Sequence, residues 1–359
     1  MNNQTSQSLW TPEVLDRAQK IANLSQVLQQ NTPERKNLEH QLMLQRNNLE
    51  QMLALCQLIE NFAKDPQQLG VALFASVELK NICEVNYKNW LMTQTPQMTQ
   101  FLTEIKAKVF ELFMRIPQKN VCNLLFECIE AFLGVDYFPS CWPEFLDLTK
   151  MALAKGDHQI NLKVFKCLEK LTQKYSREER SDPLYLEIID VVEKIHDLVM
   201  QAIQSYLNQL VSGNLEPVLA LKCLRYLLQI FYHCIFQDIH PKVEDNITNW
   251  VQILKSILSK EVENRVMQTS QNKEDAQVNI FNLKGECVKV ILLINSKYKE
   301  DFDEHLTSFT EEIWSNCLGH NKINGGKMVT YSIKYFKSCL LYTSPSPRDL
   351  STSRMPSSA

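Results

Sequence analysis

The chain has 359 residues, of which 45% are hydrophobic and 22% charged, and its net charge is −3. This composition is ordinary for a globular protein and lacks the basic excess of proteins that bind nucleic acid or anionic membranes. No apolar run reaches the length of about 18 residues that a membrane span needs, and residues 1–10 lack the form of a signal peptide. We therefore expect neither nucleic-acid binding nor membrane insertion.

Prolines divide the chain into helices, after a flexible N-terminus expected at residues 1–11. Proline is tolerated at the first position of a helix, where its missing N–H costs nothing, and Ser, Thr or Asp before it caps the helix. Five prolines follow such a residue: Thr11, Thr32, Asp65, Thr95 and Asp182. Each pair predicts a helix start.

Between the prolines the apolar residues recur with the period of an α-helix, and strand signals are nearly absent. The pattern predicts seven helix pairs: 12–29 with 33–46, 48–64 with 66–86, 97–116 with 118–134, 142–155 with 158–175, 183–211 with 215–237, 241–259 with 277–298, and 301–318 with an incomplete partner. The polar stretch 259–279 is expected to be a mobile loop. Helix pairs that recur at about 40 residues predict an all-α fold, a HEAT-type α-solenoid of about six to seven hairpins, over residues 12–338.

The segment "DYFPSCWPEFL", residues 136–146, is unusually rich in proline and aromatic residues. Pro139 and Pro143 are expected to end one hairpin and begin the next. Phe138 and Trp142 would then fill the corner between the two hairpins, because buried aromatic rings contribute a large apolar area. Packing alone is enough to account for this motif.

Residues 339–359 differ abruptly from the rest of the chain, being rich in Ser, Thr and Pro without apolar period. Codons for Cys339–Asp349 and for Ser353–Ala359 resemble a commonly used sequencing adapter. We therefore expect a non-native, disordered tail, with the natural sequence interrupted near Ser338. Helix 301–318 would then expose part of its apolar stripe, favouring self-association or fraying; the stripe comprises Phe302, Leu306, Phe309 and Trp314.

Cysteine and histidine residues give no sign of a catalytic or metal site. The cysteines lie within apolar helical patterns, so buried free thiols are expected instead of disulfides. His233, Cys234 and His240 are close in sequence but do not have zinc-ligand spacing. Cys128, between Glu127 and Glu130, has no nearby histidine to activate it. We expect no enzymatic activity, no metal and no cofactor.

Two segments carry a resemblance to a known family. "DYFPSCWPEFLDLTKMALAKGD" and "ALFASVELKNICEVNYKNW" resemble motifs of the importin-beta (karyopherin-beta) superfamily of nuclear transport receptors. Three more resemble its branch of exporters that return importin-alpha to the cytoplasm: "GDHQINLKVFKCLEKLTQKY", "FYHCIFQDIHPKVEDNITNW" and "KYKEDFDEHLTSFTEEIW". The resemblance divides the solenoid into an importin-beta N-terminal-like region, 34–110, and exporter-like repeats, 111–338. Family members are far longer, which implies that this is an N-terminal piece.

The resemblance implies an exporter that binds Ran-GTP and importin-alpha cooperatively, contacts the FG-repeat proteins of the nuclear pore, and shuttles between nucleus and cytoplasm. By motif match it implies that Ser76, Lys80 and Asn81 meet Ran. Lys80 is equally well explained as a solvated lysine, and Asn81 as part of an internal hydrogen-bond ladder. The tryptophans of the matching segments, Trp90, Trp142, Trp250 and Trp314, are expected to be structural. This chain has a few extra residues, "ICEVNYK", between Asn81 and Trp90, so the surface there is expected to differ.

Two other functions stay open. An import receptor of the same superfamily would release its cargo on binding Ran-GTP, and the segment "NITNWVQILK" also resembles import receptors. A HEAT-repeat scaffold would not bind Ran at all. The sign of the coupling between Ran-GTP and cargo separates the first two functions.

Overall fold

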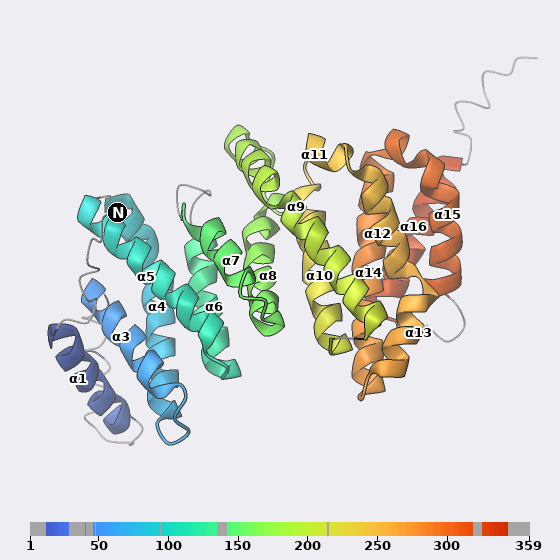
Figure 1. The fold of residues 1–359 in the computed structure, drawn as a ribbon. Helices are drawn as coiled ribbons and strands as arrows, with labels where there is room; N and C mark the ends of the chain where they lie inside the picture. Colours follow the sequence, from blue (N-terminus) through green and yellow to red (C-terminus); the bar gives the residue numbers. More distant parts are fainter. Residues whose placement is uncertain are drawn as a thin grey trace, which may run out of the picture. The chain divides into compact units, whose positions relative to one another are not determined.

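The computed structural model of the chain describes residues 12–28, 40, 46, 48–93, 95–134, 142–213, 215–318 and 325–343. These residues form fifteen α-helices and one short 3-10 helix, and they contain no strand (Figure 1). The all-α expectation is thereby confirmed. None of the described helices combines the length and apolarity that a membrane crossing requires. The chain divides into two compact units, residues 1–171 and 172–359.

Unit 1 is built from helical hairpins that pack side by side. The first helices α3 and α5 pack together, and so do the second helices α4 and α6, while α1 packs on α3. Because the α3/α4 hairpin contacts both α1 and the α5/α6 hairpin, the core is continuous from α1 to α6. The helices are α1 (Pro12–Leu28), α3 (Leu49–Phe62), α4 (Leu69–Thr93), α5 (Pro96–Arg115), α6 (Lys119–Gly134), α7 (Phe145–Leu153) and α8 (His158–Gln173), the last of which ends two residues into unit 2.

Unit 2 repeats this plan with one insertion. The hairpins are α9/α10, α12/α14 and α15/α16; the second helices α10, α14 and α16 pack side by side, as do α9, α12 and α15. A short 3-10 helix (Lys174–Ser176) precedes them. The helices are α9 (Asp182–Ser212), α10 (Pro217–Cys234), α11 (Pro241–Glu244), α12 (Ile247–Leu258), α13 (Lys260–Thr269), α14 (Lys273–Lys297), α15 (Lys299–Cys317) and α16 (Lys327–Thr343).

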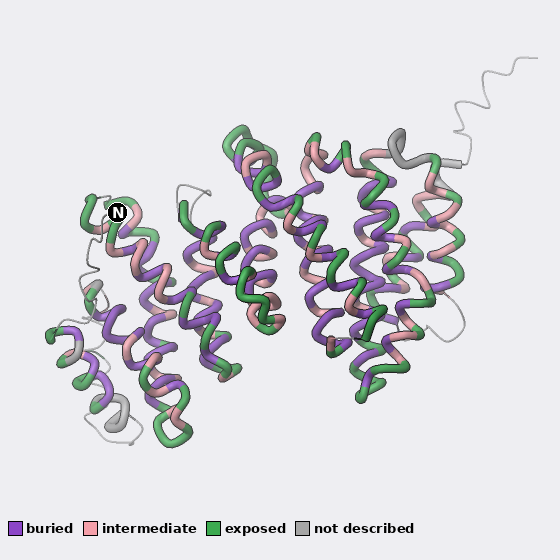
Figure 2. Tube along the Cα trace, viewed as in Figure 1, coloured by how far each residue is buried: buried purple, intermediate pink, exposed green. Residues whose placement is uncertain are grey.

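Burial follows the helical period that the sequence displays. Most described helices have one buried and one exposed side (Figure 2). In α6 the buried residues recur at steps of three and four: Val121, Leu125, Cys128, Ile129 and Phe132. This pattern is the expected result of packing an amphipathic helix against a neighbouring layer. The six hairpins of the described residues confirm the HEAT-type solenoid class.

Of the prolines with a predicted cap, Pro96 and Pro183 lie at a helix start and Pro66 does not. Pro96 begins α5, where Thr95 Oγ1 accepts a hydrogen bond from the Met98 N–H at 3.3 Å. Before Pro183 the capping residue is Ser181, so Asp182 is already helical. Asp65 instead accepts a hydrogen bond from the Gln67 N–H at 2.9 Å in a turn, and α4 begins at Leu69. The expected helix start at Asp65–Pro66 was therefore wrong, because the side chain stabilises a local turn. Thr11 and Thr32 lie outside the described residues.

Trp142 lies at the centre of an aromatic cluster in unit 1. Its ring centroid is 6.2 Å from Phe110 of α5, 5.9 Å from Phe132 of α6 and 5.1 Å from Phe145 of α7. The side chain is fully buried, whereas Pro143 is exposed. The indole therefore joins the α5/α6 hairpin to α7, the corner position that the sequence motif suggested. Phe138 and Pro139 lie outside the described residues.

Trp250 of α12 plays a similar part in unit 2. Its ring stacks on Phe231 of α10 with 3.5 Å between centroids, and its indole N–H donates to His196 Nε2 of α9 at 3.2 Å. His196 Nδ1 lies 2.9 Å from a carboxylate oxygen of Asp197, so the neutral ring that accepts from Trp250 carries its proton on Nδ1. One buried tryptophan thus ties together three helices.

The expected loop at 259–279 is wrong, because this stretch contains α13 and the first turns of α14. The apolar stripe of α13 consists of only two buried residues, Val262 and Val266, too few to predict a helix. The rest of its stabilisation is tertiary: α13 packs on α9 and α14, and Lys284 Nζ, almost fully buried in α14, lies 2.7 Å from Glu263 Oε2.

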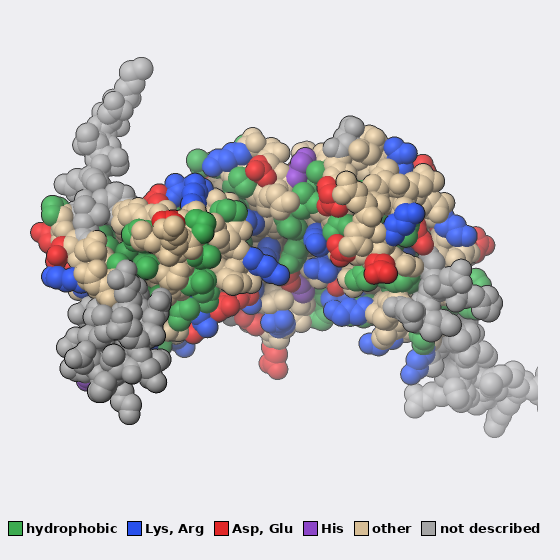
Figure 3. All heavy atoms as spheres, turned by 90° about the horizontal axis from the view of Figure 1, so that it is seen from below, with side chains coloured by type: hydrophobic (Ala, Val, Ile, Leu, Met, Phe, Trp, Pro, Cys, Tyr) green, Lys and Arg blue, Asp and Glu red, His purple; other side chains and the backbone are tan. Residues whose placement is uncertain are grey.

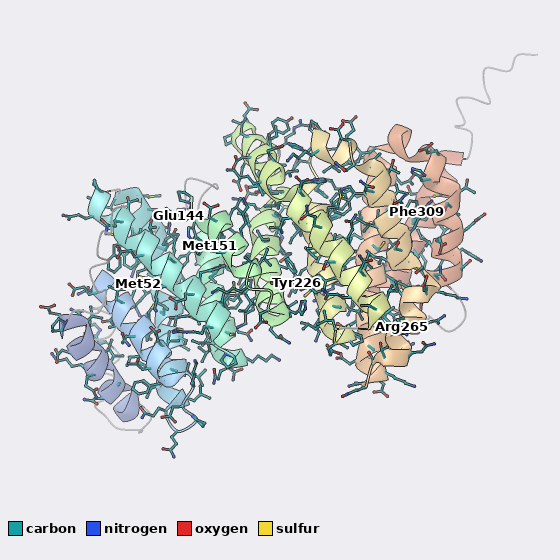
Figure 4. All side chains as sticks on the ribbon, viewed as in Figure 1. Met52, Glu144, Met151, Tyr226, Arg265 and Phe309 are labelled. Atoms are coloured by element: carbon teal, nitrogen blue, oxygen red, sulfur yellow. The ribbon has the colours of Figure 1, made fainter. Side chains whose placement is uncertain are left out.

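The helix at residues 301–318 was expected to have an incomplete partner and to expose part of its apolar stripe. This helix, α15, packs against α16, and α16 runs through Thr343. Phe309 is fully buried, with Lys255 of α12 at 5.6 Å from its ring (Figure 4). Trp314 is 65% exposed and contacts the edge of Phe336 at 5.7 Å between centroids. Part of the expected apolar stripe is therefore covered; residues 344–359 lie outside the described residues.

Replacing Trp142 with alanine is expected to lower the free energy of unfolding by about 3–5 kcal/mol, since a large cavity would open in the aromatic cluster. Trp142→Phe is expected to cost less, because the buried indole N–H has no hydrogen-bond partner among the described residues to lose. Urea unfolding followed by circular dichroism measures both. Pro143→Ala, at the exposed neighbour, serves as control, and a loss for Trp142→Ala no larger than for this control would contradict the packing role.

A second prediction concerns acid stability. Glu60 of α3 accepts hydrogen bonds from Lys108 and Arg115 of α5. Partial burial acts to raise the pKa of Glu60, but these two cations outweigh it and hold the pKa below its ordinary value of 4.5. A depressed carboxyl pKa contributes stability above the unfolded pKa, and this contribution is lost as the pH falls through the folded pKa.

Glu60→Gln should therefore destabilise unit 1 at neutral pH and have a progressively smaller effect below pH 4.5. Urea midpoints of the variant and the natural sequence, measured across this range, test the expectation. The matched control is Glu144→Gln, at an exposed carboxylate without an ion pair among the described residues. A gap between Glu60→Gln and the natural sequence that widens in acid would have the wrong sign for this mechanism.

Candidate protein-binding surface

The exposed face of α4 in unit 1 combines apolar and charged side chains. Val77 is 41% exposed, Val85 61% and Met92 72%, whereas Leu79 and Ile82 on the opposite side are fully buried. Glu84 and Lys88 lie between the exposed apolar residues at helical spacing. Exposed apolar side chains that alternate with charges are typical of a protein-binding surface, because the apolar area supplies affinity and the charges supply specificity.

The three residues of the sequence motif differ in access to this surface. Ser76 is fully buried, and its hydroxyl donates to the Ala72 carbonyl one turn earlier at 2.7 Å. Its side chain is therefore part of the core. Lys80 and Asn81 are partly exposed, and the amide side chain of Asn81 makes no hydrogen bond with the described residues. The motif thus places two of the three side chains where a partner can reach them.

Lys80 is already engaged by two carboxylates. Its ammonium lies 3.0 Å from Glu127 of α6 and 3.4 Å from Glu84 one turn along α4. The hydrogen bond to Glu127, followed by the negative charges of Glu127 and Glu84, raises the pKa of Lys80. The ammonium is thus charged and oriented, and any acidic partner must compete with Glu84 and Glu127 for it.

The next second helices of unit 1, α6 and α8, also carry charged side chains with defined contacts. Glu130 of α6 lies 2.9 Å from Lys170 of α8, and the ammonium of Lys166 lies 3.6 Å from the ring centroid of Phe126. Desolvation lowers the pKa of Lys166. We call this surface of α4, α6 and α8 the paired face, because its cations Lys80 and Lys170 have carboxylate partners. On the molecular face drawn in Figure 3, basic and acidic side chains are likewise interspersed.

The sequence did not single out Lys163, which binds the end of a neighbouring helix. Lys163 of α8 donates to three backbone carbonyls at the end of α5, those of Phe113, Met114 and Ile116, at 2.7, 3.2 and 2.8 Å. The last carbonyls of a helix lack intrahelical partners, and a cation there is also favoured by the helix dipole. Nothing in the sequence spacing marks this lysine, because its acceptors are backbone atoms about 50 residues away.

The side chains weighed for catalysis or metal binding serve structural roles. Cys128 donates its thiol to the Leu124 carbonyl at 3.3 Å. His233 Nδ1 lies 2.7 Å from the Ser176 hydroxyl, while His240 Nδ1 caps α11 by accepting from the Lys242 N–H at 3.1 Å. Burial raises the pKa of the Cys234 thiol to about 12, so it is protonated at neutral pH. Within the described ranges no group of three or more such side chains is placed to hold a metal ion.

A shallow groove of about 550 Å³ runs along the exposed face of α9. It is lined by uncharged polar side chains: Gln201, Gln204, Ser205, Asn208, Gln209 and Ser212. These groups can donate and accept hydrogen bonds but include no titratable group, so the groove itself offers no general acid or base.

Comparisons with known proteins agree with this picture. Residues 171–338 match the Cse1 family model. Exportin-2 of Oreochromis niloticus is 25% identical over 276 residues, and that of Pagrus major 26% identical over the same length; each alignment covers 73% of this chain and 26% of the relative. Human exportin-2 is 25% identical over 270 residues. The chain thus spans about a quarter of the length of the curated relatives it matches.

A solved structure shows the same fold. The exportin Cse1 in its cargo-free, cytoplasmic state superposes with a TM-score of 0.71, over 91% of this chain and 34% of the other, at 18% identity. Likeness at this identity supports the fold alone. Residues 171–338 thus match the Cse1 family model, and the chain is similar to exportin-2 within a HEAT-type α-solenoid fold.

Proposed function

We propose that this chain acts as a nuclear transport receptor of the exportin type, binding Ran-GTP and importin-alpha cooperatively to export importin-alpha from the nucleus. The observation that carries the proposal is the Cse1 match over residues 171–338, together with exportin-2 similarity over 73% of the chain. On this proposal the protein shuttles between nucleus and cytoplasm through contacts with the FG-repeat proteins of the pore.

The mechanism requires positive coupling between the two ligands. Each ligand raises the affinity for the other, typically by about 1–3 kcal/mol, and by linkage the two effects are equal. A stack of hairpins suits such coupling, since small rotations between repeats add up along the solenoid. When GTP is hydrolysed in the cytoplasm, the loss of Ran weakens cargo binding.

The paired face is the proposed contact for Ran. Val77, Asn81 and Val85 of α4 would supply contact area and a free amide, with Lys80 contributing charge. Because Lys80 already pairs with Glu84 and Glu127, its contact with an acidic partner exchanges one ion pair for another and gains little. Ser76 would act only by packing α4 into the core.

Pull-down of the chain with Ran loaded with GTP or GDP, with and without importin-alpha, tests the proposal. We expect GTP-selective binding of Ran that importin-alpha strengthens. Weakening of Ran-GTP binding by cargo would instead identify an import receptor, the alternative favoured by the segment "NITNWVQILK". No binding of either Ran form, with the fold intact by circular dichroism, would leave a HEAT-repeat scaffold.

Substitutions on the paired face are expected to act in opposite directions. Asn81→Ala should weaken Ran-GTP binding by about fivefold or more, as truncation of a central interface residue does. Lys80→Gln should weaken it less. Glu127→Gln should strengthen it, because Lys80 loses one of the carboxylates that compete with an acidic partner.

Biolayer interferometry with immobilised Ran-GTP measures these affinities. Lys150→Gln, at an exposed lysine of α7, is the matched charge control. Ser76→Ala is expected to change the affinity by less than about twofold, since its hydroxyl does not reach the surface. If Ser76→Ala weakened binding as strongly as Asn81→Ala while the fold stayed intact, this assignment of the contact residues would be wrong.

A further inference from the structure

The second helices of unit 2 form a face with a different charge pattern. On α10 the partly exposed residues recur at helical spacing and include Arg225, Tyr226 and Tyr232. The neighbouring α14 and α16 add Lys289, Tyr331 and Lys334. We call these six residues the basic aromatic face. It lies within unit 2 and shares no residue with the paired face of unit 1.

Two of the three helices of this face lack acidic residues. Neither α10 nor α16 contains an aspartate or a glutamate. The acid of α14 beside the face is Glu286, which is 8% exposed. Gln229 Nε2 donates to its Oε1 at 3.0 Å, and the Lys289 ammonium lies 3.9 Å from its Oε2.

Two cations of the face have no carboxylate partner among the described residues. The guanidinium carbon of Arg225 lies 5.5 Å from the ring centroid of Tyr226, and the Arg225 Nε is buried without a hydrogen-bond partner. The Lys334 ammonium lies 5.5 Å from the ring of Tyr331. Arg225 is partly exposed and Lys334 exposed, so an incoming anion would form charge-assisted hydrogen bonds with their accessible N–H groups.

The contrast with unit 1 makes this arrangement informative. On the paired face, Lys80 and Lys170 each contact a glutamate within 3.0 Å. Lys166 of that face lies over the ring of Phe126. On the basic aromatic face both Arg225 and Lys334 lie over aromatic rings, which stabilise a positive charge without neutralising it. The face therefore keeps a local positive potential in a chain whose net charge is −3.

We propose that the basic aromatic face is a docking site for an acidic, extended polypeptide segment. Carboxylates would bind the fork of Arg225 and the ammonium of Lys334, and the tyrosine rings would supply apolar contact between the charges. This site is independent of Ran binding and of the paired face.

The geometry favours an acidic polypeptide over a nucleic acid. Single strands bind by stacking bases on open aromatic faces. Here Lys289 already lies 3.7 Å from the ring centroid of Tyr232, and Arg225 and Lys334 are the cations nearest Tyr226 and Tyr331. A long polyanion also gains affinity from many cations along its track, whereas this face offers a few local ones.

Fluorescence anisotropy of the full chain with a labelled peptide tests the proposal. The probe is a peptide of about 20 residues with glutamate at every second position, and its control carries glutamine instead, since only carboxylates would engage the face. Binding should occur for the glutamate peptide, weaken steeply between about 50 and about 300 mM salt, and be absent for the glutamine peptide.

The double variant Arg225→Gln, Lys334→Gln should weaken peptide binding by about tenfold or more, since it removes both unpaired cations. Lys150→Gln, Lys155→Gln, which removes the same charge from exposed positions of unit 1, should change it by less than about twofold. Circular dichroism and thermal unfolding check the fold of each variant. Lys334→Gln alone, at an exposed position, is expected to weaken binding by about threefold and keeps the test valid should the double variant unfold.

Three outcomes would overturn the proposal. The first is that the glutamate peptide does not bind the natural sequence at low salt. The second is that the Lys150→Gln, Lys155→Gln control loses as much affinity as the Arg225→Gln, Lys334→Gln variant. The third outcome is that single-stranded oligothymidine or vesicles containing phosphatidylserine bind the face more tightly than the peptide and with the same variant dependence. That last outcome would assign the face to nucleic acid or lipid.

Discussion

Stacking of amphipathic hairpins is the constraint on which the rest of this structure depends. No helix pair of the chain can bury its apolar residues alone, so each must pack against the next hairpin as well as against itself. Trp142 and Trp250 show how the chain meets this constraint: each places one indole among three helices that belong to more than one hairpin. Such junctions set the spacing of the helices whose outer faces are then available for partners.

The faces left outside these junctions differ in how their charges are balanced. In unit 1, Lys80 and Lys170 of the second helices pair with glutamates of neighbouring helices, which fixes these charges in place. In unit 2, Arg225 and Lys334 of the equivalent helices lie over aromatic rings without a carboxylate partner among the described residues. A partner of the paired face must compete with glutamates that already bind its lysines. A partner of the basic aromatic face meets cations without a carboxylate partner among the described residues.

This difference in charge pairing matters for the proposed transport function, because it gives the two faces different partners. Binding two ligands cooperatively needs separate surfaces with different preferences on one deformable scaffold. The α4 surface of unit 1 and the basic aromatic face of unit 2, which lies within the stretch that matches the Cse1 family model, are two such surfaces in the described residues. The fold supplies the scaffold, and the charge pattern of each face supplies the selectivity.

The sequence alone determined the helical class, the hairpin repeat and the buried position of Trp142, because these depend on proline positions and on apolar periodicity, which are local properties. It could not locate α13, whose two buried valines give almost no period and whose stability comes from α9, α14 and the buried Lys284–Glu263 pair. It named Ser76, Lys80 and Asn81 together, but only tertiary packing decided that Ser76 is buried and that Lys80 is held by Glu127 of another helix. The sequence also could not predict that Arg225 lacks a carboxylate partner among the described residues, because this depends on which helices become neighbours. Local chemistry fixes where helices form, and contacts between residues distant in sequence decide which of their charges remain available.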